Sequence, residues 1–517
     1  MKILLVYPQY PDTFWSFKHA LKIISKQAAY PPLGLLTVAA MLPEEWEKKL
    51  VDMNVTSLTD KDLEWSDYVF ISAMVVQKHS VKKIIARSKE FNATIVAGGP
   101  LFTTGYKEFN GVDHFVLGEA EVTLRPFLED LENGRAQHIY TSDERPVITK
   151  TPIPLWSLIN MKKYAAMNIQ YSRGCPFNCD FCDIIILNGH QPRTKDKDQV
   201  LRELDAIYNQ GWRSSLFIVD DNFIGNKKKL KEKILPAIIE WMRERKYPFS
   251  TFTEAPINLA DDEELMRLMV EAGFGKVFIG IESPNEESLA ECNKINNKDR
   301  DLVASVKKIQ NYGLEVQGGF IVGFDSDPLS IFKSQINFIQ KSGIVTAMVG
   351  LLNAPRGTAL YKRLKKENRL LKDISGDNTA FSGDNTDFSI NFIPKMNYTT
   401  LINGYKLILN TIYSPKQYYE RVKIFLREFT PPPNKGRSHF QFYHIRSLFK
   451  VIWSLGIREK GRRYYWKFFL STLLRHPRSF PLSMSLAVYG FHFRKVIEKY
   501  INLPIKDILD ISQLETR

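Results

Sequence analysis

The chain has 517 residues, 44% of them hydrophobic and 25% charged, which is typical of a folded protein of about two to four domains. Its four cysteines, three of them within eight residues, exclude a disulfide framework and favour a metal or cluster site in a reducing compartment. The net charge of +14 is concentrated near the end, where residues 411–517 hold 20 Lys and Arg against 7 Asp and Glu. The chain is therefore not one that coats nucleic acid along its whole length.

The beginning of the chain carries no clear targeting signal. Its first apolar run, Met1–Tyr7, ends at Pro8 and is too short for the core of a signal peptide. No stretch reaches about 18 uninterrupted apolar residues, the length needed to cross a bilayer. We therefore expect a cytoplasmic protein without a membrane span.

Residues 1–145 alternate strand-like and helix-like segments, the pattern of an α/β domain with a parallel sheet and crossover helices. A helix is expected at Leu33–Met41. The strands are expected at Lys2–Tyr7, Lys49–Met53, Tyr68–Ser72, Thr94–Ala97 and His114–Leu117. Such a sheet binds ligands at the carboxyl ends of its strands.

Three further regions follow. Residues 146–167 contain several prolines and no clear period, which predicts a linker. Residues 168–365 hold a second strand–helix series typical of a partial (β/α)6 barrel of the TIM type. Its strands are expected at 168–172, Ser215–Val219, Ser250–Thr253, Lys276–Ile281, Val316–Val322 and Thr346–Leu352. Residues 366–517 begin with a polar loop, 372–390, and then predict a mostly helical basic domain.

A CxxxCxxC run, Cys175, Cys179 and Cys182, closes the first strand of the second series and enters a loop. Three thiolates on one short loop suit three irons of a [4Fe–4S] cluster and leave the fourth iron open to a small molecule. The alternative is a zinc site, which needs a fourth ligand. His190 lies eight residues past Cys182 and is the candidate for it.

With this motif the sequence resembles the radical S-adenosylmethionine superfamily. The resemblance implies contacts with S-adenosylmethionine from one aromatic residue in the cysteine loop and from residues at or near the ends of the next four barrel strands. These are Phe181, Asp220, Asp221, Asn222, Glu254, Glu282 and Gly319. Taken singly, an acidic residue at a strand end is more often a helix cap than a ligand. The order and placement of the set support the resemblance.

The first domain resembles the cobalamin-binding domain fused to many of these enzymes, which is doubly wound and flavodoxin-like. Tyr30–Leu35 opens a helix as in such domains. The resemblance implies cobalamin contacts at Ser72, Gly98, Gly99, Pro100, Gly118 and Glu119. Glycine lets the backbone approach a bulky ligand closely. The alternative is an ordinary flavodoxin-like sheet that binds no ligand.

The usual Asp-x-His-x-x-Gly motif after the first strand is missing. Residues 8–13 occupy its place and include no histidine. His19 and His79 are candidate cobalt ligands only because they lie near this place in the sequence. We therefore expect no histidine of this domain on the cobalt.

The last region resembles the extra domain of hopanoid-methylase-like proteins over residues 390–420 and Ser485–Lys495. Basic residues interleaved with aromatic ones predict contact with an anionic membrane surface. The aromatic residues are Trp453, Tyr464, Tyr465, Trp466, Phe468 and Phe469. One alternative is a helical cap whose aromatics form its core, and nucleic-acid binding is a weaker one.

The resemblance as a whole implies a C-methyltransferase acting on an unactivated carbon of a small molecule, with a lipid or other apolar metabolite as the candidate substrate. It implies a [4Fe–4S] cluster, S-adenosylmethionine and cobalamin as cofactors. It further implies that the substrate carbon loses a hydrogen atom to a 5′-deoxyadenosyl radical and gains a methyl group from methylcobalamin. Flavodoxin or ferredoxin would supply electrons. The rival functions are cyclisation or ring rearrangement by the same cofactors, and an iron–sulfur sensor or binding protein. No catalytic residue is assigned, and Cys292 is expected to be a structural thiol.

Overall fold

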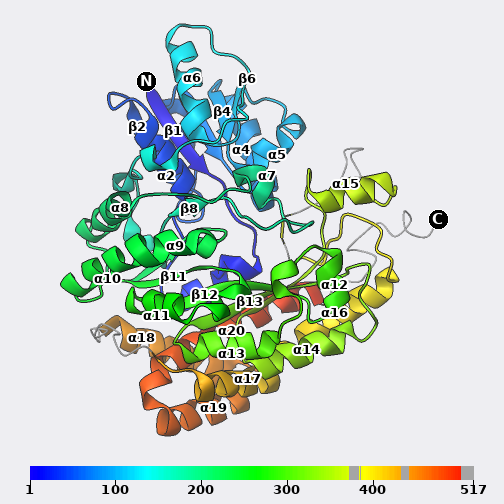
Figure 1. Cartoon of the computed structure of the whole chain (residues 1–517). Coiled ribbons are helices and arrows are strands. Elements are labelled where there is room, and N and C mark those ends of the chain that lie inside the picture. Colours follow the sequence, from blue (N-terminus) through cyan, green and yellow to red (C-terminus); the bar gives the residue numbers. More distant parts are fainter. Residues whose placement is uncertain (372–382, 385, 432–441, 502–517) are drawn as a thin grey trace. The chain divides into compact units, whose positions relative to one another are not determined.

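A computed structural model describes residues 1–371, 383–384, 386–431 and 442–501 (Figure 1). Most of the loop expected at 372–390 therefore lies outside the described residues. The chain divides into two compact units. The first comprises Met1–Asp12, Gln27–Pro176 and Asp183–Asp221, and the second comprises Thr13–Lys26, Phe177–Cys182 and the chain from Asn222 onward.

The first unit contains a six-stranded parallel sheet with strand order β2-β1-β3-β4-β5-β6. Its strands are β1 (Lys2–Tyr7), β2 (Glu47–Asp52), β3 (Tyr68–Ser72), β4 (Thr94–Gly98), β5 (His114–Val116) and β6 (Ile139–Tyr140). Its helices are α2 (Leu33–Met41), α3 (Asp60–Trp65), α4 (Lys78–Glu90), α5 (Pro100–Gly105) and α6 (Ala120–Glu132). The sequence predicted five of these strands and missed β6, which has only two residues.

Both faces of this sheet are buried, because successive side chains of a strand point to opposite sides. Leu4 and Val6 pack with residues of α3, α4 and α5, whereas Ile3 and Leu5 pack with residues of α2 and α6. Helices thus cover both faces. This confirms the expected doubly wound architecture.

The segment expected as a linker is packed into the first unit. Ile148, Trp156 and Tyr164 are buried, and Gln199 donates hydrogen bonds to the carbonyls of Ile148 and Thr151. The phenol of Tyr164 donates to buried Asp52 at 3.0 Å. Residues 146–167 therefore form an ordered part of the first unit, held by buried side chains and hydrogen bonds.

The strands of the second series are divided between the two units, two in the first and four in the second. In the first unit, β7 (Ala166–Ile169) pairs in parallel with β10 (Ser215–Ile218), beside the helices α7 (Ile184–Asn188) and α8 (Lys197–Asn209). In the second unit, β11 (Ser250–Glu254), β12 (Phe274–Glu282), β13 (Glu315–Val322) and β14 (Ala347–Leu351) pair consecutively in parallel. These strands and the helices between them confirm the expected partial barrel.

The helices of the second unit within and just after the barrel series are α9 (Lys227–Lys229), α10 (Leu235–Glu244), α11 (Glu263–Glu271), α12 (Glu286–Glu291), α13 (Leu302–Asn311), α14 (Ile331–Ser342) and α15 (Ala359–Lys366). The C-terminal helices are α16 (Tyr398–Ile412), α17 (Pro415–Glu428), α18 (Phe442–Val451), α19 (Arg462–Arg475) and α20 (Phe480–Ile501), with the π-helical turn η11 (Ile452–Arg458) between α18 and α19. The last region is therefore mostly helical, as expected. Among the described residues, none of the helices combines the length and the apolarity that crossing a membrane requires.

One segment from the start of the chain belongs to this helical region. Thr13–Lys26, which includes α1 (Lys18–Ile23), packs against α20: the rings of Phe14 and Phe493 stack at 4.0 Å, and His492 contacts the carbonyl of Phe14 at 2.9 Å. The sequence had placed these residues in the first domain. Aromatic contacts between residues nearly 500 positions apart leave no local pattern that could have predicted them.

Candidate functional site

The three clustered cysteines lie on a loop whose two ends are held together. Before the loop, β8 (Ser172–Arg173) pairs antiparallel with β9 (Arg193–Thr194), so that Arg173 faces Arg193. The backbone N–H of Cys175 donates to the carbonyl of Gly189 at 3.1 Å. Between them, Gly174 has φ +95°, and a side chain there would meet the carbonyl of Gln191 at 2.6 Å. We call this junction the neck of the cluster loop.

The thiols on this loop suit a cluster better than a single ion. Cys175, Cys179 and Cys182 form no disulfide, and within the described residues no three His, Cys, Asp or Glu side chains converge to hold one metal ion. In a cubane the three thiolates bind three different irons, so their sulfurs need not converge on one point. His190, the candidate fourth zinc ligand, is exposed. The donor set therefore fits a [4Fe–4S] cluster.

Asp220 and Asp221 follow β10 and bind the beginning and the end of the cluster-loop segment. The carboxylate of Asp220 accepts from the Tyr171 N–H at 2.7 Å and from the Ser172 hydroxyl at 2.6 Å. Burial raises the pKa of Asp220 to about 7, although these hydrogen bonds lower it in part. Burial likewise raises the pKa of Asp221 to about 6, against the hydrogen bond that it accepts from Asn188 at 3.0 Å.

In the second unit, a buried ion pair lies beside the other part of the cluster loop. Lys294 donates to Glu282 at 2.8 Å, and both side chains are at most 14% exposed. Burial alone would lower the pKa of Lys294, but the charges of Glu282, Cys179 and Cys182 raise it above its usual value. The positive charge of Lys294 therefore interacts with the thiols of Cys179 and Cys182. The sequence analysis weighed only Cys292 in this segment and missed Lys294.

The backbone around this ion pair has an uncommon conformation at Glu282 and a glycine that leaves space at position 280. Glu282 ends β12 with φ +63°, a left-handed conformation that non-glycine residues rarely adopt and that is common at functional sites. Gly280 leaves the space that the Glu282 and Lys294 side chains fill. The backbone N–H of Asp180 donates to the carbonyl of Cys292 at 3.0 Å, so the segment that carries Lys294 runs along the cluster loop.

The other residues expected near S-adenosylmethionine are placed as follows. Phe181 is half-buried, with its ring 6.4 Å from that of Phe324. Glu254 is the last residue of β11, and Asn222 is buried. Gly319 lies within β13, where a side chain would meet the ring of Phe278 at 2.8 Å. The missing side chain of Gly319 therefore makes room for Phe278.

The residues expected to bind cobalamin lie at the carboxyl ends of β3, β4 and β5. Gly99 has φ +87°, and a side chain there would meet the Ser72 hydroxyl at 2.5 Å. Gly98 lies against the carbonyl of Val116, 2.6 Å from where its Cβ would be. Pro100 begins α5. Gly118 has φ +77° and open space where its side chain would be. Gly98 and Gly99 therefore make room for neighbouring protein atoms, whereas Gly118 leaves backbone that a large cofactor could approach.

Neither of the two histidines nearest to the missing motif in the sequence falls within residues 8–13. His19 belongs to the second unit, and His79 is exposed on α4. After β1 the chain instead places the hydroxyl of Tyr10 2.5 Å from that of Tyr7 and 3.3 Å from the sulfur of Met74. Met74, two residues past β3, is exposed.

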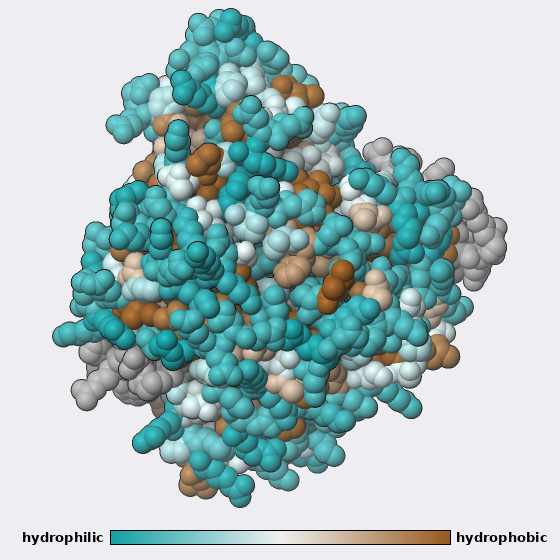
Figure 2. Space-filling model, viewed as in Figure 1, coloured by the Kyte–Doolittle hydropathy of each residue, from teal (hydrophilic) through white to brown (hydrophobic). Residues whose placement is uncertain are grey.

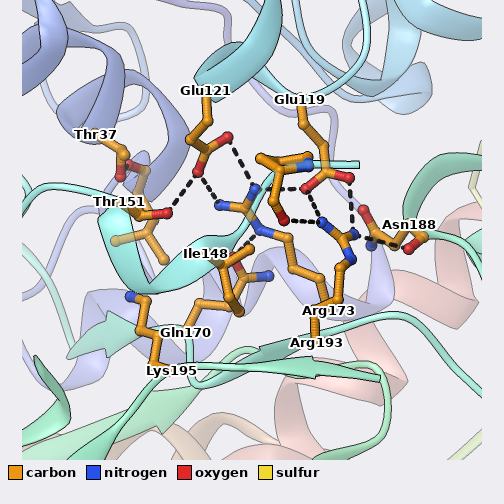
Figure 3. A network of polar contacts seen from close by, with 12 residues as sticks. Thr37, Glu119, Glu121, Ile148, Thr151, Gln170, Arg173, Asn188, Arg193 and Lys195 are labelled. Carbon is orange, nitrogen blue, oxygen red and sulfur yellow. Dashed lines mark hydrogen bonds and ion pairs between the residues drawn. The ribbon is translucent and has the colours of Figure 1, made fainter. Parts of the chain in front are cut away.

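Glu119, also expected at the cobalamin site, takes part in a network of charges (Figure 3). Its carboxylate accepts from Arg173 and Arg193 at 2.8 Å each and from Arg145 at 3.4 Å. Glu121 binds Arg173 at 2.8 Å, and the hydroxyl of Thr151 donates to Glu121 at 2.8 Å. No local pattern pointed to these arginines, because they lie 26 to 74 positions from Glu119.

Comparison with known proteins identifies the domains that carry these residues. Residues 23–128 match the B12 binding domain, residues 169–338 match the Radical SAM superfamily, and residues 358–503 match a domain of unknown function. The structure of the cobalamin-dependent S-adenosylmethionine radical enzyme OxsB with aqua-cobalamin bound is similar in fold. Its TM-score is 0.62 at 15% identity, over 99% of this chain and 81% of that one.

Two relatives are similar over nearly the whole chain. An uncharacterized methyltransferase of Synechocystis sp. is 39% identical over 99% of this chain and 96% of its own length. The hopanoid C-2 methylase of Rhodopseudomonas palustris is 32% identical over 92% of this chain and 90% of its own length. The cofactors of such proteins are a [4Fe–4S] cluster, S-adenosylmethionine and cobalamin. The chain belongs to the cobalamin-dependent radical S-adenosylmethionine methyltransferases.

Proposed function

We propose that this enzyme methylates an unactivated carbon of a lipid while docked on an anionic membrane surface. The observation that carries the proposal is a surface of exposed apolar side chains surrounded by cations on α18, η11 and α19. We call it the docking surface. The name of the hopanoid C-2 methylase, a relative over most of the chain, supports a lipid substrate.

Apolar side chains on the docking surface form two stripes. Seven of the 16 exposed large hydrophobic residues in the described part of the chain lie between positions 449 and 474, so their exposure is concentrated and not scattered. One stripe is spaced four residues apart: Phe449, Trp453 and Ile457. The other follows one face of α19: Trp466, Leu470, Leu473 and Leu474. The indole N–H of Trp466 donates to the carbonyl of Gly456 at 2.9 Å, which joins the two elements.

Not every aromatic residue expected at the membrane lies on this surface. Tyr465 and Phe468 are buried, and the ring of Phe468 stacks on that of Tyr419 at 4.9 Å. Tyr464 and Phe469 are half-buried. One face of α19 therefore packs into the helical core, as the alternative of a helical cap predicts, and the opposite face is exposed and available for the proposed membrane contact.

The charges on the docking surface complement an anionic bilayer. Arg458, Lys460, Arg462, Arg463, Lys467 and Arg475 are all exposed. The acid among them, Glu459, has its side chain 9% exposed and pairs with Arg494 at 3.2 Å. At low exposure it offsets little of the outward positive charge. Figure 2 shows apolar side chains among hydrophilic ones at the lower end of the molecule, where α19 lies.

We also propose which residues hold the cofactors, and that a low-potential flavodoxin or ferredoxin donates the electrons. Cys175, Cys179 and Cys182 would bind the cluster. Ser72, Gly98, Gly99, Pro100 and Gly118 would line the cobalamin site, and Phe181, Asp220, Asp221, Asn222, Glu254, Glu282 and Gly319 that of S-adenosylmethionine. When bound, these cofactors supply hydrogen-atom abstraction and methyl donation. The chain binds and orients them.

The experiment combines liposome flotation with product analysis. The protein should float with anionic and not with neutral liposomes, and added salt should release it, because exposed charges are screened over roughly 10 Å at 0.1 M. With methyl-labelled S-adenosylmethionine and a reductant, label should enter the organic extract of membranes. Label found only in water-soluble products, without preference for anionic liposomes, would refute the lipid proposal.

A further inference from the structure

The neck of the cluster loop brings two like charges together. In the β8–β9 pair Arg173 lies directly opposite Arg193, and like charges at opposed positions of an antiparallel pair repel. Both guanidinium groups are largely buried, with side chains 14% and 18% exposed, so water screens this repulsion poorly. A buried negative charge must therefore lie between them for the neck to stay closed.

Glu119 supplies that charge. It is 7% exposed and binds Arg193 through two parallel hydrogen bonds, Nη1 to Oε2 at 3.0 Å and Nη2 to Oε1 at 2.8 Å. Its Oε2 also accepts from Arg173 at 2.8 Å. Arg145 contacts Oε1, so each oxygen of Glu119 has two arginine partners. These contacts occupy the roughly four acceptor positions of a carboxylate. Figure 3 shows Glu119 directed at the arginines.

The same arginines hold the end of the cluster loop. Arg193 donates to the carbonyl of Asn188 at 2.9 Å, and Arg145 donates to the carbonyls of Ile186 at 2.8 Å and of Leu187. These carbonyls belong to the last turn of α7, where they lack partners within the helix and where positive charge is favourable. The next residue, Gly189, accepts from the N–H of Cys175.

We propose that Glu119 is a positioning residue for the iron–sulfur cluster: it neutralises the Arg173–Arg193 pair, and through Arg193 and Arg145 it fixes the loop that carries the three cysteines. Glu121 assists by binding Arg173 alone. This role differs from a contact with cobalamin, which the sequence had suggested for Glu119. It rests on the proposal that Cys175, Cys179 and Cys182 hold the cluster.

The test is Glu119→Gln in the full chain reconstituted with both cofactors. Iron release to a chelator should be at least about tenfold faster than in the parent, because removing one partner of a buried ion pair leaves the other charges uncompensated. The electron paramagnetic resonance spectrum of the reduced cluster should change, while bound cobalamin, measured by absorption, stays at one per chain. Glu121→Gln should have a smaller effect. Glu129→Gln, which breaks an exposed pair with Arg125 on the same helix, should have none.

A second substitution separates positioning from a general loss of stability. Adding Arg173→Gln to Glu119→Gln removes the repulsion, leaves Arg193 on the carbonyl of Asn188, and should slow iron release again. Should Glu119→Gln fail to fold, Arg145→Gln, whose side chain is 38% exposed, tests the same contact with α7. Loss of cobalamin with unchanged iron release, or no recovery in the double variant, would overturn the proposal. If Cys175→Ala kept its iron, the cluster assignment itself would fail instead.

Discussion

Lys294 donates to Glu282 across 2.8 Å, and the charge of this lysine acts on the thiols of Cys179 and Cys182. Because a nearby cation stabilises the more negative, reduced state of a cluster, Lys294→Gln should lower its midpoint potential. A change of about 1 kcal/mol corresponds to about 40 mV for one electron. Potentiometric titration followed by electron paramagnetic resonance measures it. Lys333→Gln, an exposed lysine on α14, is the control, and equal potentials in both variants would contradict the prediction.

Replacing any one of Cys175, Cys179 or Cys182 with alanine should abolish cleavage of S-adenosylmethionine, because we propose that each thiolate holds one iron. Cys292→Ala should keep about four irons per cluster. Burial raises the pKa of the Cys292 thiol, so this residue stays protonated and is a poor iron ligand. Iron and sulfide analysis with detection of 5′-deoxyadenosine tests both statements. Wild-type cleavage by the Cys182 variant would defeat the cluster assignment.

Bound cobalamin in the Co(II) state should show no nitrogen hyperfine splitting from a protein histidine, because neither His19 nor His79 lies in the place of the missing motif. Electron paramagnetic resonance settles this directly. Splitting that disappears in His79→Ala would contradict it.

A larger side chain tests the cobalamin site only at a position where it leaves the fold of the domain intact. A valine at Gly98 would press on the carbonyl of Val116 and disturb the sheet itself. Met74 is exposed just past β3, so Met74→Trp should lower cobalamin binding and leave both the cluster and the fold intact. Absorption spectra and circular dichroism separate these effects. Full cobalamin uptake by Met74→Trp would place the cofactor elsewhere.

Weakening either component of the docking surface should reduce liposome binding. Leu470→Ser with Leu474→Ser removes apolar contact, and each exposed cation replaced by glutamine should cost on the order of 1 kcal/mol on anionic liposomes. Leu407→Ser is the matched control, because Leu407 is similarly exposed on α16 but lies outside the surface. Flotation gives the bound fraction. Equal loss in the control and in the Leu470 and Leu474 variant would argue against a specific surface.

Asp220 should make the folded protein less stable as the pH rises. Its pKa is raised to about 7 by burial, so between about pH 4 and pH 7 the folded chain binds a proton that the unfolded chain has released. The contribution of Asp220 to the free energy of unfolding is complete below about pH 4 and is lost as the pH rises past about 7. The loss is on the order of 1–4 kcal/mol. Asp220→Asn should flatten this dependence in denaturant titrations at pH 5 and pH 8. An unchanged difference between the two pH values would show that Asp220 is ionised when folded.

Much of the fold was predictable because it follows from local patterns. The helix Leu33–Met41 and the strands Lys2–Tyr7 and Tyr68–Ser72 have the predicted bounds, since continuous apolar runs identify strands buried on both faces. The spacing of the cysteines similarly indicated the cluster.

What the sequence could not predict depends on contacts between distant positions. Nothing near Glu119 indicates that Arg173 and Arg193 will meet it, and nothing in α19 shows which aromatic face packs on Tyr419. Lys294 could have been noticed, because it lies two residues past Cys292. Its relation to the cluster loop, however, depends on how the chain returns there after β12.

The placement of Thr13–Lys26 in the second unit bears on how these enzymes can be recombined. A chimaera that exchanges residues 1–145 as a cassette would bring a foreign Phe14 to a resident Phe493 and disturb the core around α20. Productive exchange would have to leave Thr13–Lys26 with its own C-terminal helices, or carry α20 along. Natural shuffling of cobalamin domains among relatives faces the same constraint, so this segment and α20 should have been inherited as a pair.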